Sequence, residues 1–162
     1  MRSLLLICCA LLTMNAMAAD DIRAKLLAFN PLNGTLESSR SFTTVESAFN
    51  QDNHCILVSK STTFAKADKA FENENVMTID FTNIPIQEMY AAHRDGGSWL
   101  NVKYQVHATL TRSLIHYNVI SASMPGMVYE RDDDYFIFMF NELEQVTQAQ
   151  QLLIDIITEC QK

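Results

Sequence analysis

Apolar and polar residues alternate with a period of two between residues 99 and 140. In the stretch WLNVKYQVHATL, one face would carry Leu100, Val102, Tyr104, Val106, Ala108 and Leu110. Such alternation predicts antiparallel strands with one buried face. The pattern continues from Ser113 to Ala122 after a predicted turn at Thr111-Arg112. The stretch MVYERDDDYFIFMF then predicts a hairpin whose tip is Asp132 to Asp134.

The two ends of the chain have helical spacing instead. A helix is expected from about Glu142 to Cys160, with Asn141 as its N-terminal cap. Its apolar stripe consists of Leu143, Val146, Leu153, Ile156, Ile157 and Cys160. A short helix is also expected over residues 20–29, and Pro31 would end it.

Short helices and strands are predicted between these ends. Thr43, three residues before Glu46, is a capping-box spacing that predicts one helix, and TTFAKADKAF at residues 62–71 predicts another. Pro85 would begin a third, with apolar positions at helical spacing up to His93 and Gly96-Gly97 as its end. Strands are predicted at residues 55–60 and 76–81. The expected fold is α+β, with an antiparallel meander over residues 99–140 packed against a C-terminal helix.

The first eighteen residues predict an export signal. One basic residue, an apolar run from Leu4 to Leu12 and small residues at Ala16 and Ala18 follow the order of a secretory signal peptide. We therefore expect a signal at residues 1–18 and a single compact domain at 19–162. No later segment is long and apolar enough to span a membrane. The predicted location is the periplasm or, failing that, the extracellular space.

Charge narrows the class of partner. Removing the signal removes Arg2 and no acidic residue, so the formal charge falls from −7 to −8. An acidic surface argues against binding to nucleic acid or anionic lipid, and it favours either solubility alone or a basic partner.

The mature chain would keep two cysteines, Cys55 and Cys160. In an oxidising compartment an even pair most simply forms one disulfide. This bond would close a loop of about a hundred residues and, in the chain-entropy account, would stabilise the fold by about 3 to 5 kcal/mol.

We find no catalytic constellation and no cofactor motif. His93-Arg94-Asp95 has the letters of a kinase catalytic loop, but that loop needs an Asn five residues after its Asp, where this chain has Leu100. The histidines lack zinc-motif spacing, so no metal is expected. His107 and His116 would lie near one another across the predicted turn, which leaves a metal or hydrolytic site there as an alternative.

The strand YFIFMF, residues 135–140, is apolar on both faces. The C-terminal helix can cover the face of Phe136, Phe138 and Phe140 but not the opposite one. Either the early helices cover that opposite face, or part of it is a protein-binding surface. The residues of such a surface would be Trp99, Tyr135, Ile137 and Met139.

The stretch VMTIDFTNIPIQEMYAAHRDGGSWLNV, residues 76–102, resembles the strand, helix and strand of the short N-terminal domain of secretins and TonB-dependent receptors. The matching residues are Ile79, Phe81, Ile84-Pro85-Ile86, Glu88, Met89, Gly97 and Leu100-Asn101-Val102. Residues 127–140 are similar to the closing hairpin of that family. The resemblance implies a small periplasmic adaptor that docks through its sheet, and no catalytic residue.

The sequence thus favours a non-enzymatic exported module that binds a protein partner in a bacterial envelope assembly for secretion or transport. The first alternative is an acidic periplasmic immunity protein or inhibitor of a basic cell-wall hydrolase. The second alternative is a small metal-binding or hydrolytic protein that uses His107 and His116. The sequence does not indicate an oligomeric state.

Overall fold

The structure is a computed structural model that describes residues 20–29, 32–82, 84–93, 104–140 and 142–162. The predicted signal peptide, Pro31, the double glycine, Trp99 and the predicted cap Asn141 lie outside these residues.

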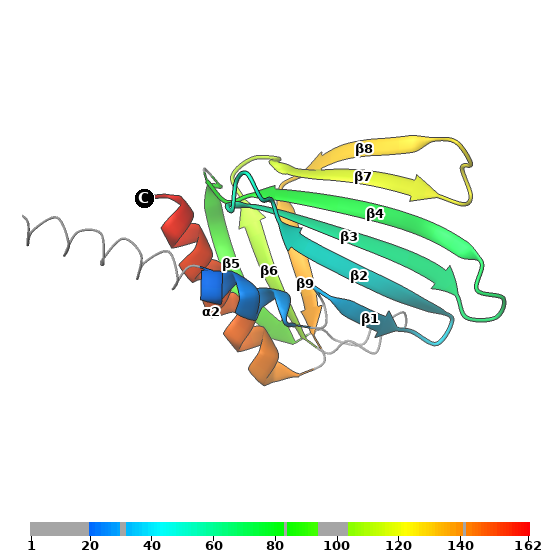
Figure 1. Ribbon diagram of the computed structural model, residues 1–162, viewed down its shortest axis with the longest axis horizontal. Coiled ribbons are helices and arrows are strands. Elements are labelled where there is room, and N and C mark those ends of the chain that lie inside the picture. The colour runs from blue at the N-terminus through cyan, green and yellow to red at the C-terminus, as the bar shows by residue number, and fades with distance from the viewer. Residues whose placement is uncertain (1–19, 30–31, 83, 94–103, 141) are drawn as a thin grey trace, which may run out of the picture.

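Within the described residues, nine antiparallel strands form two sheets (Figure 1). The larger sheet has the order β1-β2-β3-β4-β7-β8, and the smaller has the order β5-β6-β9. The strands of the larger sheet are β1 (Gly34–Glu37), β2 (Ser41–Phe49), β3 (Ile56–Ala65), β4 (Phe71–Asp80), β7 (Ile115–Ser121) and β8 (Val128–Asp133). Those of the smaller sheet are β5 (Ile86–His93), β6 (Tyr104–Leu110) and β9 (Tyr135–Phe140).

The chain passes from one sheet to the other at three corners. Few residues separate β4 from β5, four separate β6 from β7, and Asp134 alone separates β8 from β9. At the last two corners, Leu110 N–H donates to the Asp134 carbonyl over 2.7 Å and Leu114 N–H to the Asp133 carbonyl over 3.1 Å. Strands that change sheet at a bend allow two sheets to share one core.

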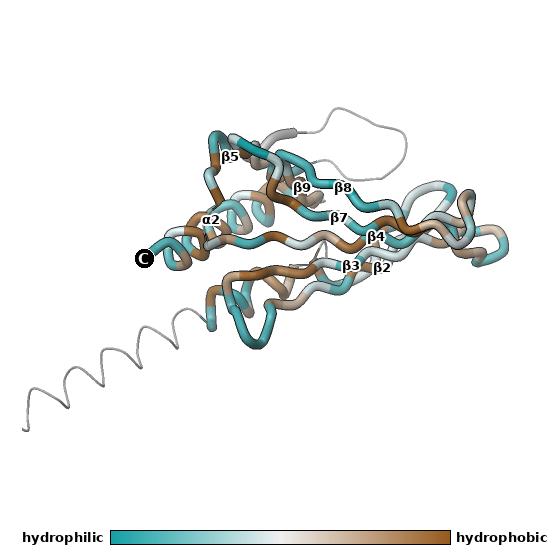
Figure 2. Tube along the Cα trace, turned by 90° about the horizontal axis from the view of Figure 1, so that it is seen from above, coloured by the Kyte–Doolittle hydropathy of each residue, from teal (hydrophilic) through white to brown (hydrophobic). Residues whose placement is uncertain are grey.

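In the part of the chain that the structure describes, two helices complete the α+β fold, a short one at residues 20–27 and α2 (Leu143–Cys160). Helix α2 packs on β5, β6 and β9. Figures 1 and 2 together place both helices on one side of the smaller sheet. We call this covered side the inner face and the opposite side the outer face. Within the described residues, no helix is long and apolar enough to cross a membrane.

The core lies between α2, the inner face and the nearer part of the larger sheet. Its fully buried side chains include Leu26, Leu57, Ile79, Phe81, Ile115, Phe136, Phe140, Leu153 and Ile156. The predicted stripe of α2 is confirmed at Val146, Leu153, Ile156 and Ile157. Leu143 departs from it, because this first residue of the helix is 56% exposed.

Helix α2 is fastened at its C-terminal end. The predicted disulfide joins Cys55 to Cys160, with a Cα–Cα distance of 5.7 Å. Beside it, the buried Arg23 donates through Nε to the His54 carbonyl over 2.9 Å and lies 3.5 Å from a Glu159 carboxylate oxygen. The short helix, the start of β3 and the end of α2 therefore meet at one point.

The three helices predicted between residues 43 and 93 are wrong, because these segments are strands. Thr43 and Glu46 lie in β2, where Thr43 pairs with Thr63 and Glu46 points to solvent. Residues 62–71 form the end of β3, a turn at 66–70 and the start of β4. Residues 86–93 form β5, which pairs with β6. The helix that the family resemblance implies at that place is therefore a strand.

The predicted hairpin tip is also wrong. Asp132 and Asp133 end β8, and Asp134 lies at the corner before β9. Strand β8 does not pair with β9 but forms a hairpin with β7. The tip of that hairpin is a turn at residues 124–127, in which Met127 N–H donates to the Met124 carbonyl over 3.2 Å. Gly126 has a φ of 80° there, which favours glycine at this turn position.

Candidate functional site

Three aromatic rings stack on the outer face of the smaller sheet, one from each strand. The ring of His107 lies between those of Tyr90 and Tyr135, with centroid distances of 5.2 and 5.7 Å and interplanar angles of 9° and 26°. Tyr90 is 37% exposed and Tyr135 38% exposed. We call these three residues the aromatic ladder. Cross-strand aromatic pairs of this kind stabilise a sheet while leaving the outer edges of their rings available for contact.

Alternation along β9 separates the two faces. Phe136, Phe138 and Phe140 are buried against the inner side, whereas Tyr135, Ile137 and Met139 are exposed or half-buried. Among the described residues, no helix or further strand packs over the outer face (Figure 2). Of the two alternatives that the sequence leaves open, cover by early helices therefore fails, because the three segments predicted as helices are strands of the two sheets and the short helix lies on the inner side.

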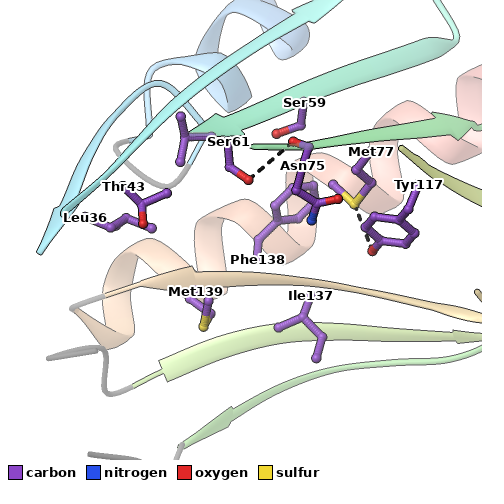
Figure 3. A pocket seen from close by; sticks show the side chains of 11 residues that line it. Leu36, Thr43, Ser59, Ser61, Asn75, Met77, Tyr117, Ile137, Phe138 and Met139 are labelled. Atoms are coloured by element: carbon purple, nitrogen blue, oxygen red, sulfur yellow. Dashed lines mark hydrogen bonds between the residues drawn. The ribbon is translucent and has the colours of Figure 1, made fainter. Parts of the chain in front are cut away.

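A pocket of about 220 Å³ lies where β9 crosses the larger sheet (Figure 3). We call it the corner pocket. Ile137, Phe138 and Met139 of β9 form one wall. The larger sheet supplies the other wall, with Leu36, Thr43, Val45, Ser59, Ser61, Asn75, Met77 and Tyr117. Since Ile137 and Met139 belong both to the outer face and to the pocket, the two features are continuous.

Hydrogen bonds fix the polar side chains of the pocket wall. Ser47 Oγ donates to Ser59 Oγ over 2.8 Å, and the hydroxyls of Thr43 and Thr63 are 2.9 Å apart. These pairs are cross-strand neighbours in β2 and β3, where the alternation of each strand brings small hydroxyl residues to the same face.

Tyr117 is the one tyrosine among the residues that line the pocket. Its hydroxyl donates to Met77 Sδ over 3.2 Å, and the Arg131 guanidinium lies 4.9 Å from the ring centroid. Burial of the side chain, together with the nearby Asp133 carboxylate, raises the pKa of Tyr117 to about 12. The phenol is therefore neutral at physiological pH and serves as a hydrogen-bond donor rather than as a base.

The two histidines of the proposed metal site do not meet. The predicted turn at 111–112 is a corner, and β6 and β7 belong to different sheets. His107 is paired with Tyr90 and Ile137, while His116 Nδ1 lies 2.8 Å from a carboxylate oxygen of Asp132. No group of three or more potential metal ligands occurs in the described part of the chain. The prediction that His107 and His116 lie near one another across a turn is therefore wrong.

The structure brings together most of the residues predicted for a binding surface. Tyr135, Ile137 and Met139 share the outer face, whereas Trp99 lies outside the described residues. Tyr90 is not among the residues predicted for this surface, because the apolar spacing of residues 86–93 predicts a helix. The available signal was the alternation of Glu88, Tyr90 and the intervening Met89, which is weak over so short a stretch.

Comparisons with protein-family models, with curated proteins and with solved structures find no match for this chain.

Proposed function

We propose that the protein is an exported, non-enzymatic module that binds a protein partner of the bacterial envelope through its outer face. The observation that carries this proposal is the aromatic ladder, three stacked rings on a sheet face that no described element covers. Tyrosine is enriched at protein interfaces, because its ring is apolar and its hydroxyl can bond to a partner.

The charge around the ladder indicates the chemistry of the partner. Strands β5, β6 and β9 contain one acidic residue, Glu88, and no Lys or Arg. Glu88 is exposed two residues from Tyr90, and Asp134 is exposed next to Tyr135. A partner with basic residues around an apolar centre would complement this surface, and long-range attraction would speed its association.

The same charge supports a second candidate, an immunity protein or inhibitor of a basic cell-wall hydrolase. Without its predicted signal the chain has a formal charge of −8. Electrostatic attraction of an acidic inhibitor to a basic enzyme weakens as salt increases. A captured partner that is a basic hydrolase, and whose association slows at high salt, would favour this candidate over the adaptor.

The experiment is affinity capture from an envelope extract with three immobilised proteins: the wild type, the double variant Tyr90→Ser with Tyr135→Ser, and the control Tyr129→Ser. Tyr129 is a suitable control because it is also an exposed tyrosine, at 57%, but lies on β8 of the other sheet. We expect a protein that the wild type and the control retain and the double variant loses. Equal retention by all three would contradict the proposal.

A further inference from the structure

The corner pocket has no charged side chain among the residues that line it. A buried carboxylate, phosphate, ammonium or guanidinium group would find no opposite charge there, and burying an unpaired charge is costly. The lining therefore selects against ionic ligands and favours a neutral group.

The pocket wall has two chemical parts. Hydroxyl and amide groups come from Thr43, Ser59, Ser61 and Asn75, whereas the β9 side of the pocket is apolar (Figure 3). Asn75 Oδ1 is buried and has no hydrogen-bond partner among the described residues. A buried carbonyl without a donor is unfavourable. Asn75 lines the pocket, so a donor group that enters the pocket comes close to this amide.

The size of the pocket limits the ligand further. Its volume of about 220 Å³ is below the range of roughly 300 to 1,000 Å³ for sites of drug-sized ligands. A pocket of this size suits one large side chain. A ligand that complements both walls has an apolar body, which contacts the β9 side, and a neutral N–H or O–H donor, which bonds to the polar side.

We propose that the corner pocket receives a tryptophan or tyrosine side chain of the protein partner. This inference rests on the proposed function and names the group by which the partner is anchored. Trp, Tyr and Arg dominate the energetics of protein interfaces, and the uncharged lining excludes Arg. Because Ile137 and Met139 belong both to the outer face and to the pocket wall, a partner that covers the ladder also reaches the mouth of the pocket.

The test uses indole as the probe, with indene as its analogue without the N–H donor. Titration of the isotope-labelled protein by NMR should give saturable shifts at Ser61, Asn75 and Ile137. Indole should bind about fivefold more tightly than indene, the factor expected for one net hydrogen bond. In Asn75→Leu this preference should disappear while indene still binds.

A matched pair of variants locates the probe. Ser61→Phe places a ring in the pocket, whereas Thr62→Phe adds the same ring to the opposite face of β3, because adjacent strand residues point to opposite faces. Indole binding should be lost in Ser61→Phe and kept in Thr62→Phe. Absence of saturable indole binding to the wild type, or unchanged binding to Ser61→Phe, would overturn the inference.

Capture of the partner separates this inference from the proposed function. Loss of capture in both Ser61→Phe and the Tyr90/Tyr135 double variant, but not in Thr62→Phe, is the expected result. Capture that Ser61→Phe retains and the double variant loses would overturn the anchor alone. Capture that the double variant retains would overturn the proposed function.

Discussion

The two faces of the smaller sheet come from the same three strands, yet they differ in what covers them. On the inner face, Val106, Phe136 and Phe138 are at most 4% exposed and belong to the core against which α2 packs. On the outer face, Tyr90 and Tyr135 keep more than a third of their surface exposed. Both faces are rich in large apolar or aromatic side chains. The comparison shows that such residues contribute most to stability where another layer covers them, whereas on the uncovered face they contribute less and keep part of their surface exposed.

The largest expected effect is a difference in stability between variants at two adjacent residues of β9, one on each face of the sheet. Phe136→Ala should lower the free energy of unfolding by about 3 to 5 kcal/mol, because it leaves a cavity under α2. Tyr135→Ala should lower it by about 1 kcal/mol or less, because that ring loses only a cross-strand contact. Urea denaturation of both variants measures the difference. Equal losses would contradict the assignment of the two faces.

The next effect concerns the disulfide that holds α2, the helix that covers the inner face. The Cys55–Cys160 disulfide ties the end of α2 to the start of β3. Its removal in the double variant Cys55→Ala with Cys160→Ala should cost about 2 to 4 kcal/mol of unfolding free energy. A reducing agent should lower the denaturation midpoint of the wild type and leave that of the double variant unchanged. A wild-type midpoint that does not respond to reduction would rule out this role.

A third effect concerns pH and the buried Tyr117. Since burial raises the pKa of Tyr117 from 10 to about 12, the folded state favours the neutral phenol. The resulting stability is fully present below pH 10 and is lost as the pH rises from about 10 to 12. Denaturation midpoints at a series of alkaline pH values should therefore fall less steeply in Tyr117→Phe than in the wild type. Parallel curves would refute this origin of the alkaline loss.

The smallest expected effect sharpens the role of the ladder. Tyr90→Ser removes one of the two ring contacts of His107 and should lower the free energy of unfolding by about 0.2 to 1 kcal/mol. Tyr129→Ser, on an exposed edge strand, is the control for loss of a tyrosine elsewhere. A loss of several kcal/mol for Tyr90→Ser would mean that the outer face belongs to the core and is not a docking surface.

The sequence predicted those parts of the fold whose periodicity is long or whose chemistry is specific. The long stripe of α2, the alternation in β6 and β9 and the pairing of the two cysteines were all predicted and are present. Outside the predicted signal the sequence has two cysteines, which allow only one intramolecular disulfide.

Short segments were predicted less well, because their apolar spacing fits a helix and a strand equally. Residues 86–93 have apolar side chains at helical spacing, but β6 offers a strand partner, and tertiary pairing overrides local preference. The tip of the β7–β8 hairpin contains Pro125-Gly126, which is a turn signal. The run of three Asp residues at 132–134 is also typical of a turn, and the sequence alone does not decide between the two positions.

The candidate site was predicted in part for the same reason. Alternation in β9 is enough to place Tyr135, Ile137 and Met139 on one face. The corner pocket depends on how β9 crosses the larger sheet, and the ladder depends on the register among β5, β6 and β9. Both depend on pairing between residues far apart in the sequence, and the local periodicity of a strand does not predict that pairing.

The central claim is that the outer face contacts another protein. The most direct test is to replace Tyr135 by the photo-crosslinking amino acid p-benzoylphenylalanine and, in a separate protein, to replace Tyr129 in the same way. Irradiation of cells that export each protein should give a specific protein adduct from position 135 and none from position 129. An adduct from position 129 alone, or from neither position, would contradict the claim.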